Sequence, residues 1–79
     1  MIVLTRDIKH RIRLANTPEK FATLLHELFM QASYGSKFHN LLGLASKMNE
    51  AAIETNDRQL FENTRSQLIN SLKFPILFL

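Results

Sequence analysis

The dipeptide His26-Glu27 invites comparison with a metalloprotease site. In the motif HExxH, two histidines one helical turn apart bind zinc and the glutamate acts as the general base. Residue 30 is Met30, so the second imidazole is missing and the motif is incomplete. We therefore interpret His26 and Glu27 as a solvated pair on the polar face of a helix.

The other titratable residues form no catalytic or metal-binding pattern. His10 and His39 lie on different segments without ligand spacing, and the chain has no cysteine. It also lacks a glycine-rich phosphate loop and a Ser-His-Asp order with its supporting motifs. Glu50 and Glu54 are four residues apart and indicate a solvated acidic edge of a helix. We therefore expect a protein that is not an enzyme, with no catalytic residue, metal ion or cofactor.

Basic residues near the N-terminus form a first candidate binding feature. The formal net charge is +3; residues 1–20 contain five basic and two acidic residues, whereas residues 21–79 contain five of each. The basic face of Arg6, Lys9, Arg11 and Arg13 could contact nucleic-acid phosphates or an acidic protein, or could simply be solvated. The segment has no aromatic residue for base stacking and no DNA-reading motif, which argues against nucleic acid.

The C-terminal sequence FPILFL is a second candidate. Its apolar side chains would promote aggregation if they stayed in water, so they must pack on the domain itself, on a second copy or on another protein. The sequence Met1–Leu4 is also apolar, and the two ends could pair as short strands. We predict that Phe74, Ile76 and Phe78 contribute to partner binding.

These residues must be positioned mainly by helices, because apolar residues recur every three or four positions. The clearest helix is predicted from Pro18 to Ser33, with Thr17 as its N-cap and Gly35 as its left-handed C-terminal residue. Its apolar face consists of Phe21, Leu24, Leu25, Leu28, Phe29 and Ala32.

The segment of residues 1–16 is compatible with two structures. A helix started by Thr5 places Ile8, Ile12 and Ala15 on one face, whereas a strand places Ile8, His10, Ile12 and Leu14 on one side. We favour the helix, because every neighbouring segment is helical and an isolated strand needs a partner.

Two further helices follow. The first is predicted from Lys37 to about Glu54, with Ser36 as its cap; Leu44, Ala51 and Ile53 widen its apolar face, so we expect it to pack on two neighbours. Short loops imply antiparallel neighbours.

The last helix is predicted from about Asp57 to Leu72 and stopped by Pro75. Asn56 and Gln59 have the spacing of a capping pair, which places a turn before this helix. A single unbroken helix over residues 37–73 is the alternative.

Two polar residues fall within apolar helix faces. Asn49 lies among Phe38, Leu42 and Ala45, where a buried amide must form hydrogen bonds and often fixes the register of packing. Arg65 lies among Leu68, Leu72 and Ile69, and we interpret it as a snorkelling residue whose guanidinium reaches water.

Together these features predict an all-α protein, a compact antiparallel bundle of three to four short helices in one domain of residues 1–79. With 79 residues and no cysteine, its core is small, so we expect a homodimer or a higher oligomer. We expect no signal peptide, no membrane association and a cytoplasmic location. The predicted function is a small protein-interaction module that regulates or inhibits a larger intracellular machine. The alternative is a basic nucleic-acid-binding protein that acts as a dimer.

Overall fold

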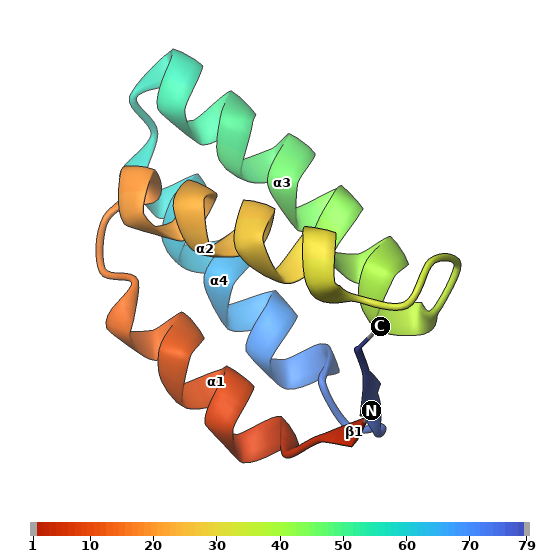
Figure 1. Ribbon diagram of the computed structural model, residues 1–79. Coiled ribbons are helices and arrows are strands. Elements are labelled where there is room, and N and C mark those ends of the chain that lie inside the picture. Colours follow the sequence, from red (N-terminus) through yellow and green to blue (C-terminus); the bar gives the residue numbers. More distant parts are fainter. Residues whose placement is uncertain (1, 79) are drawn as a thin grey trace.

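The periodicity of the sequence is realised as four helices in the computed structural model, which describes residues 2–78 (Figure 1). The elements are β1 (Ile2–Val3), α1 (Thr5–Leu14), α2 (Pro18–Gln31), α3 (Lys37–Thr55), α4 (Arg58–Ser71) and β2 (Ile76–Leu77). The predicted all-α bundle is confirmed, and the first segment is helical as favoured. Consecutive helices α2, α3 and α4 run antiparallel (Figure 1).

Three of the four helices begin at a side-chain cap. The hydroxyls of Thr17 and Ser36 accept hydrogen bonds from the backbone N–H groups of residues 20 and 39, which confirms both predicted caps. The cap of α4 is Asp57, which accepts from the N–H of Leu60. The prediction that Asn56 caps this helix is wrong. Asn56 instead adopts a left-handed conformation with φ of 52° and ends α3, a role in which asparagine is tolerated.

The central helix α2 ends earlier than predicted. It stops at Gln31 instead of Ser33, and its C-cap Ala32 is extended instead of left-handed. Ala32 forms a β-bridge with Phe78, and the N–H of Ser33 donates to the carbonyl of Leu77. These contacts with the C-terminal segment draw the chain out of the helix. Gly35, with φ of 76°, therefore does not cap α2 and lies in the turn before α3.

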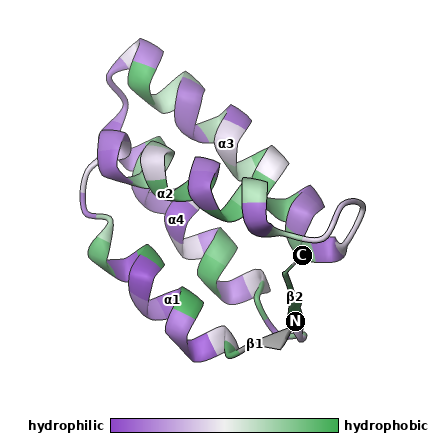
Figure 2. Ribbon diagram, viewed as in Figure 1, coloured by the Kyte–Doolittle hydropathy of each residue, from purple (hydrophilic) through white to green (hydrophobic). Residues whose placement is uncertain are grey.

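The four helices enclose a core to which each of them contributes. α3 packs on both α2 and α4, as predicted, and α1 packs on α4 and α2. Hydrophilic and hydrophobic residues alternate along each helix (Figure 2). The largest fully buried side chains include Phe21, Phe38 and Phe61, from three different helices. Leu44, Ala51 and Ile53 are exposed, so α3 reaches its two neighbours without them.

The two termini pair as the short antiparallel strands that the sequence suggested. Ile2 lies opposite Leu77, and Val3 lies opposite Ile76. Side chains alternate between the two faces of a strand, so Ile76 is fully buried while Leu77 is 42% exposed. Phe78 is buried against the ring of Phe38, with 6.2 Å between ring centroids. The tail therefore packs on its own domain. Residues 1 and 79 of the predicted apolar termini lie outside the described residues.

Candidate functional site

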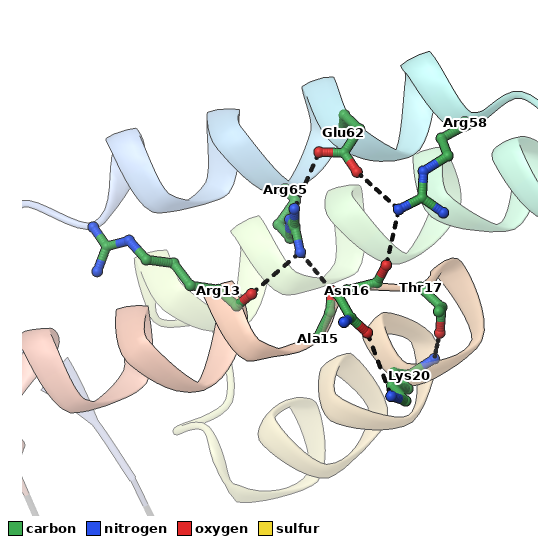
Figure 3. Close-up of polar contacts among 8 residues, drawn as sticks. All are labelled: Arg13, Ala15, Asn16, Thr17, Lys20, Arg58, Glu62 and Arg65. Atoms are coloured by element: carbon green, nitrogen blue, oxygen red, sulfur yellow. Dashed lines mark hydrogen bonds and ion pairs between the residues drawn. The ribbon is translucent and has the colours of Figure 1, made fainter.

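The four basic residues predicted as one face of α1 have different surroundings. Arg6 is exposed, and Lys9 is half-exposed one turn further along. Arg11 faces α2, where its guanidinium lies 3.3 Å from the carboxylate of Glu27. Arg13 is exposed in the last turn, and its side chain points away from the polar contacts around it (Figure 3). Only Arg6 and Lys9 lie beside the C-terminal segment.

The three predicted binding residues of the tail are also separated by the fold. Ile76 and Phe78 are buried in the core and present no side chain to a partner. Phe74 is half-buried. Its carbonyl oxygen accepts a hydrogen bond of 3.2 Å from the hydroxyl of Thr5, which ties the tail to the start of α1. Of these three residues, Phe74 alone is placed to contact another molecule.

Three adjoining hollows meet at Phe74. The first has a volume of about 430 Å³ and lies between the start of α1 and the end of α4. Its lining includes Arg6, Lys9, Lys73 and Phe74. The other two lie between α3 and the tail, and both include Lys37 and Phe74. We call this region the Phe74 surface, defined by Arg6, Lys9, Lys37, Leu44, Lys73, Phe74 and Leu77.

The Phe74 surface combines positive charge with exposed apolar side chains. The ammonium of Lys37 lies 5.9 Å from the centroid of the Phe74 ring, a distance typical of a cation–π contact. None of the described residues that line the three hollows is acidic. Leu44 and Leu77, which are 57% and 42% exposed, lie in the hollows beside the ring. The arrangement suits an acidic group next to an apolar one.

The basic residues of α4 are used differently. The guanidinium of Arg65 donates hydrogen bonds of 2.8 Å and 3.3 Å to the carbonyl oxygens of Ala15 and Arg13 (Figure 3). Those carbonyls belong to the C-terminal end of α1, where helical partners are missing and the helix dipole is negative. The prediction that Arg65 snorkels into water is wrong: its side chain is only 17% exposed.

Two neighbours complete this group of contacts. Glu62 lies 3.0 Å from Arg65 and 3.4 Å from Arg58, so one carboxylate bridges both guanidinium groups. Arg58 also donates a hydrogen bond of 3.0 Å to the carbonyl of Asn16 (Figure 3). We call Arg58, Glu62 and Arg65 the Arg65 cluster. It fixes α4 to the loop between α1 and α2 and has a structural role.

Asn49 is buried between α3 and α2, as predicted. Its side-chain N–H donates a hydrogen bond of 3.0 Å to the carbonyl of Pro18, which joins the two helices. Its Oδ1 is buried and accepts no hydrogen bond from any residue between 2 and 78. An unsatisfied buried acceptor costs about 1–3 kcal/mol. Asn49 therefore links α3 to the first residue of α2 and leaves its Oδ1 without a hydrogen bond from the described residues.

The remaining candidates for chemistry stay apart. Glu27 pairs with Arg11 of α1, and His26 is exposed. Within residues 2–78, no group of three or more His, Asp or Glu side chains is placed to hold a metal ion. No helix in the described part of the chain is long and apolar enough to cross a membrane.

Comparison of the chain with models of protein families, with curated proteins and with solved structures finds no match in any of the three. The function must therefore be argued from the geometry.

Lys37 and Lys73 are the basic members of the Phe74 surface that sequence reasoning missed. They lie on different segments from the basic residues of α1, and each is an isolated lysine in the sequence. The predicted pairing of the two termini could have identified Lys73, because this pairing places Lys73 and Phe74 beside Thr5 and Arg6.

Proposed function

We propose that the protein is a non-enzymatic interaction module that binds an acidic segment of a larger cytoplasmic protein on the Phe74 surface and thereby regulates or inhibits it. One observation carries the proposal: Arg6, Lys9, Lys37 and Lys73 surround a half-buried aromatic ring, and no acidic residue among those described lines the hollows between them. Clustered positive charge of this kind attracts and orients an acidic partner.

The exposed leucines of the same surface favour protein over nucleic acid as the partner. Leu44 and Leu77 flank Phe74 and offer apolar area that a sugar-phosphate backbone would not bury. Proteins that bind single-stranded nucleic acid stack successive bases on several aromatic rings, whereas this surface has one ring. The alternative predicted from the sequence, nucleic-acid binding as a dimer, would use the same cations and is tested below.

The homodimer predicted from the sequence stays a prediction, but the fold changes which apolar residues could form its interface. The prediction rested on the small core and on the apolar ends of the chain, and Ile76 and Phe78 of the tail are buried within a single chain. The exposed Leu44 and Leu77 and the half-buried Phe74 offer apolar area near the tail to a second copy. Light scattering of the purified protein distinguishes a 9.2 kDa monomer from a dimer.

The test of the proposed function is affinity capture from the native host with a charge-reversed variant. Replacing Lys9, Lys37 and Lys73 by Glu inverts the charge of the Phe74 surface at exposed or half-exposed positions. Such changes usually alter stability by less than about 0.5 kcal/mol each. We expect the parent protein to capture a specific partner and the variant to lose it, with affinity for the purified partner reduced at least roughly tenfold.

A matched variant controls for net charge. Arg13, Lys20 and Lys47 are exposed and lie outside the hollows around Phe74, so replacing them by Glu changes the net charge equally. This variant should retain the partner. Equal capture by both variants would contradict the proposal, and capture abolished by nuclease treatment would establish the nucleic-acid alternative in its place.

A further inference from the structure

A shallow groove runs along the line where α3 and α4 pack side by side and antiparallel (Figure 1). Its middle part has a volume of about 60 Å³, which is too small for a small-molecule site. It continues into the hollow of about 570 Å³ beside Phe74, because Leu41, Leu44 and Ser71 line both. We call this continuous depression the α3–α4 groove, lined by Lys37, Leu41, Leu44, Met48, Gln67 and Ser71.

The wall that α3 contributes to the α3–α4 groove is apolar. Leu41, Leu44 and Met48 are spaced by three and four residues, which places them in one stripe along the helix. Leu44 is 57% exposed, and the other two residues are half-buried. The opposite wall carries the exposed Gln67 and Ser71 of α4. The α3–α4 groove therefore presents an apolar stripe that is bounded by neutral polar side chains.

Charge is confined to one end of the α3–α4 groove. None of the described residues that line its middle part is charged. At the other end, the ammonium of Lys37 lies 5.9 Å from the centroid of the Phe74 ring, and Lys73 directly precedes Phe74 in the chain. Neither lysine forms an ion pair with a residue between 2 and 78. An occupant of complementary charge carries acidic groups at this end and uncharged apolar groups along the rest.

The backbone around the α3–α4 groove limits the conformation of its occupant. Backbone groups in the middle of α3 and α4 are hydrogen-bonded within their own helices, so the walls offer no row of free N–H and C=O groups to an extended chain. The adjacent strand β2 already pairs with β1, and its Leu77 carbonyl accepts a hydrogen bond from the N–H of Ser33. A helical occupant needs no such partners, because it satisfies its own backbone groups.

We propose that the α3–α4 groove binds an amphipathic helix of the partner protein. The apolar residues of this helix pack against the stripe of α3, and its acidic residues lie next to Lys37 and Lys73. The inference rests on the proposed function, because it describes the acidic segment that binds the Phe74 surface. From Lys37 to Met48, α3 rises by about 16 Å, so a helix of about three turns spans the groove.

Two synthetic peptides of about 16 residues, equal in composition and charge, test the helical occupant. Both begin with acidic residues. The first then has leucines every three or four positions, whereas the second has the same leucines at alternate positions, which no helix gathers on one face. Each is titrated into the protein labelled with nitrogen-15. We expect the first peptide to bind at least roughly tenfold more tightly, because only its leucines are buried together. It should shift the amide signals of Met48 and Gln67 and gain helical circular dichroism on binding, since helices this short are marginal in water.

Variants of the protein test the two ends of the α3–α4 groove separately. Met48→Glu places a charge in the uncharged part and should weaken binding of the first peptide at least roughly tenfold. Met30→Glu, at an exposed position of α2 outside the groove, changes the net charge equally and should bind this peptide normally. Lys37→Ser with Lys73→Ser should weaken binding of both peptides. The amide shifts of the parent protein keep the test decisive if Met48→Glu does not fold.

The outcomes separate this inference from the proposed function. Equal binding of the two peptides, with shifts confined to the surroundings of Lys37 and Lys73, would overturn the helical occupant and leave the proposed function intact. Failure of both peptides to bind would also overturn the inference, whereas the proposed function is decided by the capture test above. A dimer of the protein that Met48→Glu dissociates would assign the α3–α4 groove to a second copy and likewise overturn the proposal.

Discussion

At the Arg65 cluster, a guanidinium that is largely buried donates to two backbone carbonyls and to Glu62. At the Phe74 surface, Lys9, Lys37 and Lys73 form no ion pair with any residue between 2 and 78. Arg6 of the same surface lies 4.0 Å from the exposed carboxylate of Asp7. The cations of the Phe74 surface come from segments far apart in the sequence, whereas Arg58 and Arg65 both lie on α4 and share Glu62 as a partner.

We propose that this difference separates a folding role of the Arg65 cluster from a binding role of the Phe74 surface. Hydrogen bonds to charged groups contribute about 1.5–3 kcal/mol when they are partly buried, and the Arg65 cluster satisfies carbonyls that α1 leaves unpaired. Exposed cations contribute little to stability, so their accumulation around Phe74 is not explained by the fold. The positive charge there is available to another molecule.

The largest loss of stability is expected when a buried residue of the C-terminal tail is truncated. Ile76 is fully buried beneath it, so Ile76→Ala should lower the free energy of unfolding by about 2–5 kcal/mol, as for other large-to-small core substitutions. Leu77→Ala, one residue further and on the exposed face, should cost far less. Urea titration followed by circular dichroism measures both. Equal losses of stability in the two variants would contradict the packing of the tail, in which Ile76 is buried and Leu77 is exposed.

The Arg65 cluster should be the next most sensitive. Arg65→Met keeps much of the apolar stem but removes the hydrogen bonds to Ala15 and Arg13, so we expect a loss of about 2–3 kcal/mol. Arg13→Met, at an exposed side chain, should change stability by less than about 0.5 kcal/mol. Amide hydrogen exchange in the last turn of α1 should accelerate only in Arg65→Met. If Arg65→Met unfolded with the same free energy as the parent protein, the hydrogen bonds of Arg65 would not stabilise the fold, and the prediction would be wrong.

A smaller effect is expected at the turn between α3 and α4. Asp57→Ala removes the cap of α4 and should cost about 1 kcal/mol, which corresponds to a fall in melting temperature of roughly 4–8 °C for a domain of this size. Asn56→Gly should be neutral or slightly stabilising, because glycine adopts the left-handed conformation without strain. Thermal melts would show the opposite order if Asn56 were the cap.

The helices could be predicted because their signals are local. Apolar spacing and the caps Thr17 and Ser36 lie within a few residues of the turns they specify. The end of α2 could not, since Ala32 leaves the helix to pair with Phe78, more than forty residues away. The role of Arg65 was missed for the same reason: its acceptors belong to α1.

The candidate site was only partly predictable. Arg6, Lys9 and Phe74 were identified from charge and from the unusual tail, but their meeting depends on the pairing of β1 with β2. Lys37 and Lys73 carry no local signal, because an isolated lysine usually marks a solvated surface. The residues of this surface are far apart in the sequence, and this separation, more than their types, prevents their grouping from being predicted.

The most direct test of the division between the two regions compares two double variants in the same two assays. Lys37→Ser with Lys73→Ser should leave the free energy of unfolding within about 0.5 kcal/mol of the parent and weaken binding of the captured partner at least roughly tenfold. Arg58→Ser with Arg65→Ser should lose about 2–4 kcal/mol of stability and bind the partner normally where it remains folded. The reverse pattern, with stability lost at the lysines and binding lost at the arginines, would contradict the account.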